Sequence, residues 1–198
     1  EYLSQRGAKV ILASHLGKPK GTVVPELSLK PIADVLRQML RVPPVKFVGA
    51  VVGESVKQAL NTIKPGEVLL LENLRFDRGE EANDPVFAKQ LASLAEVYVN
   101  DAFGTLHRAH ASTYGAAHLF SDRVAGFLVR KEMEVLSQVR DHPARPFRVV
   151  VGGIKIKVGQ PDWKTDLDRV AALREHLGDG PLMVDANQQW DRARARRM

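Results

Sequence analysis

The chain has 198 residues, of which 44% are hydrophobic and 26% charged, with a net charge of +6 and no cysteine. This composition predicts one globular α/β domain with a short appendage and excludes disulfides, thiolate metal sites and cysteine nucleophiles. No apolar run approaches the length of a membrane span, and the N-terminal residues do not resemble a signal peptide. We therefore expect a cytoplasmic protein without a membrane partner.

Short apolar runs alternate with amphipathic stretches along the chain. We predict strands at residues 8–14, 45–48, 67–71, 97–100, 148–151 and 182–184, and helices at 29–40, 55–61, 85–95, 131–139 and 166–177. Ser28 is a suitable N-cap for the first helix, and Asp84 followed by Pro85 predicts the start of the third. The nearly continuous apolar runs are typical of parallel strands covered on both faces. The order therefore predicts an α/β fold, a parallel sheet with helices on both faces.

Three segments place cationic or hydrogen-bonding side chains directly after a predicted strand. They are residues 14–21 (Ser-His-Leu-Gly-Lys-Pro-Lys-Gly), 72–76 (Glu-Asn-Leu-Arg-Phe) and 100–110 (Asn-Asp-Ala-Phe-Gly-Thr-Leu-His-Arg-Ala-His). Because loops at the carboxyl ends of parallel strands lie side by side, we expect one crevice to collect the cationic side chains His15, Lys18, Arg75, Arg108 and His110. Such side chains repel one another unless an anion binds, and arginine forks match phosphate and carboxylate oxygens. The sequence therefore predicts an anion site.

The net charge of +6 also raises the question of nucleic acid. The basic residues are scattered, however, and no nucleic-acid-binding motif or aromatic-interleaved basic stripe is present. The first loop also lacks the Gly-rich Lys motif of a nucleotide P-loop. We therefore expect a small phosphorylated substrate as the partner and no nucleic acid.

These three segments, in this order, resemble signature stretches of the phosphoglycerate kinase family, and the resemblance covers residues 7–153. It implies a Rossmann-like substrate-binding domain over residues 1–146 and the start of a truncated nucleotide domain at 147–153. It also implies a set of residues that contact 3-phosphoglycerate: His15, Leu16, Gly17, Lys18, Arg75 and Arg108, with His110 in the same basic patch.

The family's reaction moves a phosphoryl group between 1,3-bisphosphoglycerate and ADP in glycolysis, with MgATP/MgADP as the nucleotide. By resemblance, the family's first strand would lie before Glu1 and the complementing nucleotide-binding domain would follow Gly153. In-line transfer needs both substrates held together, so we expect binding with little or no turnover. Lys18 stands where the family usually has arginine, and the loss of a bidentate fork lowers the expected affinity.

From Ile154 onward the chain resembles a different family. Residues 154–162 (Ile-Lys-Ile-Lys-Val-Gly-Gln-Pro-Asp) and 182–191 (Leu-Met-Val-Asp-Ala-Asn-Gln-Gln-Trp-Asp) flank a predicted helix. This piece, residues 154–198, is similar to a β-α-β unit of the TIM-like barrel in enolase-superfamily acid-sugar dehydratases of the galactarate/talarate type. The resemblance implies Lys157 as the catalytic base, Lys155 on the same face of its strand, and Asp185 as one Mg²⁺ ligand. Both families carry a lysine shortly after this join, so Lys155 is also a candidate cofactor-binding residue.

The two resemblances meet at Gly152-Gly153, which we interpret as a join. An engineered chimera, a mistaken assembly and a sequence that is not one natural gene all remain open. Three functions also remain open: a phosphoglycerate kinase-like domain, a magnesium-dependent acid-sugar dehydratase, and a non-catalytic fused scaffold. The first is preferred, because a single Asp at a strand end is more often a cap or turn residue than a metal ligand.

Overall fold

The computed structural model describes residues 1–40, 45–142, 154–157 and 182–185, together with residues 168, 171, 172 and 175. The chain divides into two compact units, Glu1–His142 and Pro143–Met198. The predicted strand at 148–151 and most of the predicted helix at 166–177 lie outside the described residues. The two units are considered separately below.

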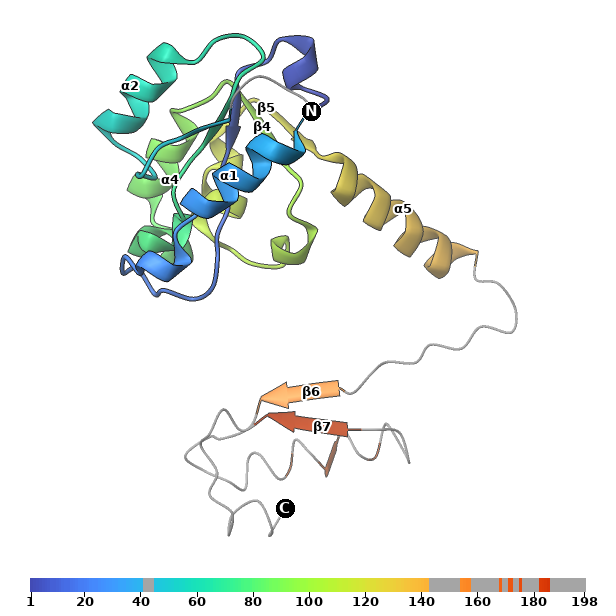
Figure 1. The fold of residues 1–198 in the computed structure, drawn as a ribbon. Helices are drawn as coiled ribbons and strands as arrows, with labels where there is room; N and C mark the ends of the chain where they lie inside the picture. Colours follow the sequence, from blue (N-terminus) through green and yellow to red (C-terminus); the bar gives the residue numbers. More distant parts are fainter. Residues whose placement is uncertain are drawn as a thin grey trace. The chain divides into compact units, whose positions relative to one another are not determined.

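Within its described residues, the first unit contains five strands and five α-helices (Figure 1). The strands are β1 (Val10–Leu12), β2 (Val45–Phe47), β3 (Val68–Leu70), β4 (Val97–Asn100) and β5 (Asp122–Ala125). The helices are α1 (Lys30–Met39), α2 (Glu54–Thr62), α3 (Arg78–Ala82), α4 (Pro85–Ala92) and α5 (Phe127–Asp141). Short 3₁₀ turns lie at Ser4–Arg6, Pro25–Leu27, Leu74–Phe76, Phe103–Thr105 and Ala117–Leu119, and a π-helix at Ala111–Gly115.

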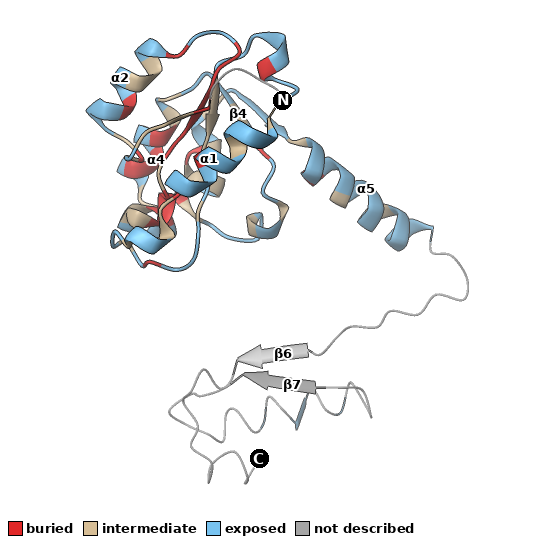
Figure 2. Ribbon diagram, viewed as in Figure 1, coloured by how far each residue is buried: buried red, intermediate tan, exposed pale blue. Residues whose placement is uncertain are grey.

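A three-stranded parallel sheet forms the core of the unit, with β3 between β1 and β2. Alternate side chains of β3 face opposite layers: Leu70 lies in one cluster with Ala33 of α1, whereas Leu69 lies in another with Val56 of α2. All four are almost fully buried, and β3 is the most buried strand of the unit (Figure 2). Helices therefore cover both faces of a parallel sheet, which confirms the predicted α/β class.

β4 and β5 form a second parallel pair, and among the described strands no hydrogen-bonded pairing joins this pair to β1. The sequence pattern did not predict β5. Its four residues, Asp122 to Ala125, are all exposed and two are charged, so the apolar alternation that marks a strand is absent. Backbone pairing with β4 alone defines it.

Capping explains where α4 and α5 begin. Pro85 opens α4, and the Asp84 carboxylate accepts a hydrogen bond from the Phe87 amide at 2.8 Å, which confirms the predicted start. α5 begins at Phe127, four residues before the prediction, because the Asp101 carboxylate accepts from the Leu128 amide at 2.7 Å. A cap that comes from 27 residues away leaves no local sequence signal.

In the second unit, β6 (Ile154–Lys157) and β7 (Leu182–Asp185) pair in parallel. Residues 168, 171, 172 and 175, between them in sequence, are helical. The strand–helix–strand order matches the prediction, while the assignment of this piece to a barrel stays a prediction. In the part of the chain that the structure describes, no helix is both long enough and apolar enough to cross a membrane.

Candidate functional site

The loops after β1 and β3 are held together by one buried side chain. Asn73 has no exposed surface, and its Nδ2 donates to the carbonyl oxygens of Leu16 at 2.8 Å and Leu27 at 2.9 Å. Its Oδ1 accepts from the amide of Arg75 at 3.1 Å. Because the Asn73 side chain itself has no contact with water, these bonds tie the backbone of Leu16, Leu27 and Arg75 to one buried group.

Glu72, next to Asn73, ties the same segment to the residues that directly precede α1. Its Oε1 accepts from the Leu29 amide at 2.8 Å, and its Oε2 accepts from the Ser28 hydroxyl at 2.7 Å. The segment after β3 thus holds the start of α1 as well as the first loop. The sequence analysis chose residues 72–76 because of Arg75. It did not predict that Glu72 and Asn73 hold the neighbouring loops together. The only local signal for that role is that two polar residues directly follow a buried strand.

Arg75 is itself largely buried, with 5% of its surface exposed. Its Nη1 donates to the carbonyl oxygen of Gly17 at 2.8 Å, and its Nε lies 3.6 Å from Oε1 of Glu81. Gly17 has a φ of +65°, and a Cβ there would meet the side chain of Leu27 at 2.9 Å. The loop conformation that presents the Gly17 carbonyl to Arg75 therefore requires glycine.

Four predicted residues from three loops gather into what we call the cationic cluster: His15, Arg75, Arg108 and His110. Burial lowers the pKa of His15 below its ordinary value, and the nearby positive charges of Arg75, His110 and Arg108 lower that pKa further. The carboxylate of Glu81 acts in the opposite direction. His15 thus experiences the charges of all the other members, and an anion placed among them would relieve their repulsion.

The remaining predicted residues contribute differently. Lys18 is exposed, and none of the ion pairs among the described residues involves it. Leu16 and Gly17 use their carbonyl groups for the bonds to Asn73 and Arg75. Because a carbonyl oxygen cannot donate a hydrogen bond to an anion, any hydrogen bond from these two residues to an anionic ligand would come from their amide groups.

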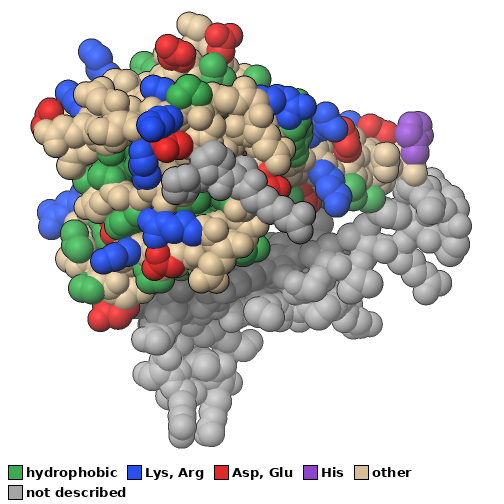
Figure 3. All heavy atoms as spheres, turned by 45° about the horizontal axis from the view of Figure 1, so that its top comes forward, with side chains coloured by type: hydrophobic (Ala, Val, Ile, Leu, Met, Phe, Trp, Pro, Cys, Tyr) green, Lys and Arg blue, Asp and Glu red, His purple; other side chains and the backbone are tan. Residues whose placement is uncertain are grey.

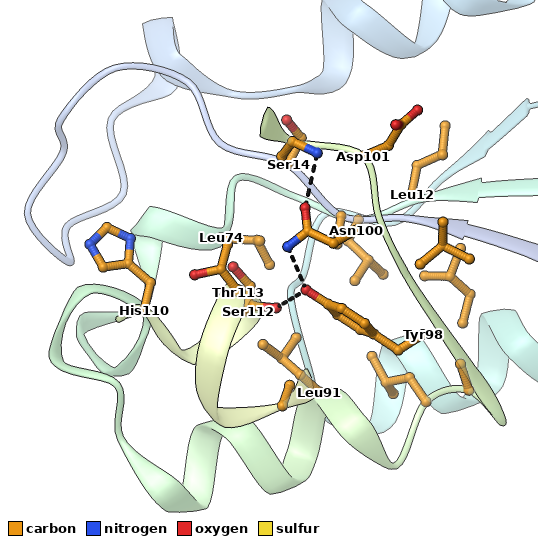
Figure 4. Close-up of a pocket in the computed structure, with 18 of the residues that line it drawn as sticks. Leu12, Ser14, Leu74, Leu91, Tyr98, Asn100, Asp101, His110, Ser112 and Thr113 are labelled. Carbon is orange, nitrogen blue, oxygen red and sulfur yellow. Dashed lines mark hydrogen bonds between the residues drawn. The ribbon is translucent and has the colours of Figure 1, made fainter. Parts of the chain in front are cut away.

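A cavity of about 430 Å³ adjoins the cationic cluster, and both His15 and His110 line it. It lies between the end of β1 and the end of β4 and has an apolar base that includes Leu12 and Leu91 (Figure 4). Its volume is within the range of small-molecule sites. Polar side chains along β4 and the π-helix line the rest, together with the two histidines and the carboxylates of Glu80 and Asp101.

The wider surface shows no single basic field on the face drawn in Figure 3. Lys and Arg side chains of the described residues are interspersed there with Asp and Glu. This distribution agrees with a local anion site and does not resemble a basic stripe that would follow a nucleic-acid backbone.

In the second unit, the backbone register places Lys157 of β6 opposite Asp185 of β7, and Lys155 opposite Met183. The predicted base Lys157 and the predicted Mg²⁺ ligand Asp185 are therefore neighbours across one strand pair. Among the described residues, no group of three or more His, Cys, Asp or Glu side chains is placed to hold a metal ion.

Two family models match the chain. One, described as phosphoglycerate kinase, matches residues 1–159, and the other, described as enolase C-terminal domain-like, matches residues 134–198. The phosphoglycerate kinase of Moorella thermoacetica is 56% identical over 177 residues, which cover 89% of this chain and 42% of that protein. The phosphoglycerate kinase of Leptospira biflexa is 54% identical over 173 residues, covering 87% of this chain and 43% of that protein.

Solved structures give the same result. The structure of phosphoglycerate kinase from Coxiella burnetii matches with a TM-score of 0.63 and 32% identity, covering 87% of this chain and 41% of that one. The phosphoglycerate kinase from Pyrococcus horikoshii matches with a TM-score of 0.64 and 29% identity, covering 88% and 42%. The chain thus spans less than half the length of these relatives.

Proposed function

We propose, because the chain belongs to the phosphoglycerate kinase family, that its first unit binds 3-phosphoglycerate at the cationic cluster. The observation that carries this proposal is that Arg75 from one strand-end loop and Arg108 and His110 from another all act electrostatically on His15. Lys18 is exposed on the first loop, and we propose that it adds a flexible charge to the site. The substrate's phosphate and carboxylate are the anions that such a set of donors recognises.

The chemistry of phosphoryl transfer asks for cations and positioning, and it asks for no protein nucleophile. The cationic cluster meets the first demand. Burial and the nearby positive charges lower the pKa of His15, and an anion that neutralises those charges would raise that pKa again. Binding of an anion would therefore favour proton uptake at His15.

Complete turnover needs MgATP or MgADP held in line with the substrate. The chain spans 42% of the Moorella thermoacetica enzyme. We infer that this chain binds substrate but transfers phosphoryl groups poorly or not at all without a complementing nucleotide-binding domain. A cytoplasmic location, where the glycolytic substrates are found, is part of this proposal.

Isothermal titration calorimetry of the full chain with 3-phosphoglycerate at low ionic strength tests the proposal directly. Saturable binding is expected, weakened by Arg108→Ala. A folded chain that takes up no 3-phosphoglycerate under these conditions would falsify the assignment, and rapid ATP formation from 1,3-bisphosphoglycerate and MgADP would contradict the predicted lack of turnover.

A second candidate concerns the C-terminal piece. The enolase-like match to residues 134–198 and the register of Lys157 opposite Asp185 favour a fragment of a magnesium-dependent acid-sugar dehydratase. We propose the division predicted above: 1–146 as the substrate-binding domain, 147–153 as the start of a nucleotide domain and 154–198 as the barrel fragment. Mg²⁺ requires several oxygen ligands, and Asp185 supplies at most one side chain of that set, so no catalytic step is assigned to this unit.

Two measurements test the second candidate. The chain is incubated with Mg²⁺ and a panel of aldarates. Formation of a keto-deoxy product would support the dehydratase function, and the absence of product across the panel would argue against it. The intact mass, with the nucleotide sequence that encodes residues 151–157, decides whether one gene encodes both pieces. A folded chain that neither binds 3-phosphoglycerate nor dehydrates aldarates would be a non-catalytic scaffold.

A further inference from the structure

The segment from Asn100 to Ser112 carries two members of the cationic cluster, Arg108 and His110. It leaves β4 at Asn100 and rejoins the body at the π-helix that begins at Ala111. Arg108 is exposed. Its amide donates to the Thr105 carbonyl oxygen at 2.9 Å and its carbonyl oxygen accepts from the Thr113 hydroxyl at 2.9 Å, so its position depends on these bonds as well as on how firmly the segment is held at its two ends. A chain segment of this length loses much conformational entropy when it is ordered.

Both ends of the segment meet at one hydroxyl group. Tyr98 Oη donates a hydrogen bond to the carbonyl oxygen of Ser112 at 2.8 Å and accepts one from Nδ2 of Asn100 at 3.1 Å (Figure 4). On the far side of Asn100, its Oδ1 accepts from the amide of Ala102 at 3.0 Å. The start and the end of the segment are thereby tied to a single tyrosine ring that is fixed in β4.

A buried carboxylate completes the network from the other side. Glu80 of α3 is 2% exposed, and its two oxygens accept from the Ser112 hydroxyl at 2.6 Å and the Ser112 amide at 2.9 Å. Its Oε1 also lies 3.8 Å from Nδ1 of His110. Burial of a carboxylate is costly unless hydrogen-bond donors face it. As long as α3 keeps Glu80 buried, Ser112 is therefore held next to this carboxylate as its donor.

We propose that Tyr98, Asn100, Ser112 and Glu80 form a clamp that positions Arg108 and His110 for anion binding, an inference that rests on the proposed function. The clamp residues are positioning residues, since they act on the ligand through the segment they hold. Burial raises the pKa of Tyr98 above its ordinary value, so the hydroxyl remains a donor to Ser112 throughout the neutral and mildly alkaline range.

Tyr98→Phe is the sharpest test, because it removes one oxygen atom from the centre of the network and leaves the ring. Tyr114→Phe is the matched control: Tyr114 lies in the π-helix but is 51% exposed, and its ring packs against His118. We expect Tyr98→Phe to weaken 3-phosphoglycerate binding about fivefold to tenfold, the size of one lost internal hydrogen bond. Tyr114→Phe should bind within twofold of the unchanged chain.

Glu80→Gln tests the buried end of the clamp. The amide of glutamine offers one oxygen acceptor in place of two, so one of the two hydrogen bonds from Ser112 is lost, and we expect a loss of affinity of about the same size. Glu67→Gln is its control, since Glu67 is also buried but pairs with Lys46 away from the cluster. Titrations are compared at a temperature where circular dichroism shows every variant fully folded.

Hydrogen exchange of the amides from Ala102 to Ser112 provides a readout that needs no ligand. The clamp predicts faster exchange of this stretch in Tyr98→Phe, with exchange in β3 unchanged. If exchange and affinity in Tyr98→Phe equal those of Tyr114→Phe, the clamp is disproved. If the unchanged chain does not bind 3-phosphoglycerate, the proposed function fails, and faster local exchange would still establish the clamp as a structural device.

Discussion

Arg75 and Gly17 are joined by a hydrogen bond of 2.8 Å from Nη1 to the backbone carbonyl oxygen. A side chain predicted to contact substrate therefore also holds the first loop in place. The two roles share one guanidinium, because its planar fork presents several donors in different directions. Arg75 is thus expected to affect both stability and binding.

Replacement of Arg75 should reduce both stability and ligand binding, whereas replacement of an exposed surface arginine should affect neither strongly. Arg75→Ala should lower the free energy of unfolding by about 1–3 kcal/mol and weaken 3-phosphoglycerate binding at least about tenfold. Urea unfolding and calorimetry measure the two effects. Arg130→Ala, which removes an exposed ion pair with Glu134 on α5, is the control, and equal effects of the two substitutions would contradict the double role.

Asn73 should matter for stability more than any exposed asparagine. Its side chain makes three hydrogen bonds without any exposed surface, so Asn73→Ala removes the partner of the buried Arg75 amide and of two partly buried carbonyl groups. We expect a loss of roughly 3 kcal/mol in the free energy of unfolding. Asn61→Ala on the exposed side of α2 should change it little, and a small effect at Asn73 would disprove its framework role.

The lowered pKa of His15 makes both stability and binding depend on pH. Below pH 6.5 the unfolded chain takes up a proton at this residue more readily than the folded chain, so stability should fall as the pH falls. An anion stabilises the protonated form, so affinity should rise over the same range. Sulfate is a suitable probe, because it does not titrate there.

Calorimetry in two buffers of different ionisation enthalpy measures the proton uptake that accompanies sulfate binding. The charged neighbours Arg75, Arg108, His110 and Glu81 remain in His15→Gln, so the difference between this variant and the unchanged chain isolates His15. Identical proton uptake by both proteins would show that His15 is not linked to anion binding.

Lys18 offers a substitution that should improve binding. Arginine at this position restores a bidentate fork, so Lys18→Arg should strengthen 3-phosphoglycerate binding about threefold to tenfold. Lys20→Arg, two residues along the same loop and also exposed, is the matched control. Equal affinities for the two variants would place Lys18 outside the site.

The sequence predicted the parts of the fold that depend on local pattern. The apolar runs that became β1 to β4 and the cap of α4 by Asp84 carry their signals within a few residues. Because the carboxyl ends of parallel strands lie together, the gathering of His15, Arg75, Arg108 and His110 was also predictable.

Features that depend on distant partners were not predictable. α5 starts early because Asp101, far away in sequence, caps it, and β5 exists only through pairing with β4. Glu80 and Glu81 are adjacent in sequence, yet Glu80 binds Ser112 while Glu81 lies beside Arg75. No pattern in one chain distinguishes a buried carboxylate from its exposed neighbour when the difference lies in tertiary contacts.

The most direct test of the account is a two-dimensional NMR titration of the full chain with 3-phosphoglycerate at low ionic strength. The account predicts saturable shifts concentrated at residues 15–18, Arg75 and residues 108–110. An absence of shifts in a folded chain, or shifts confined to β6 and β7, would contradict the assignment of the cationic cluster as the substrate site.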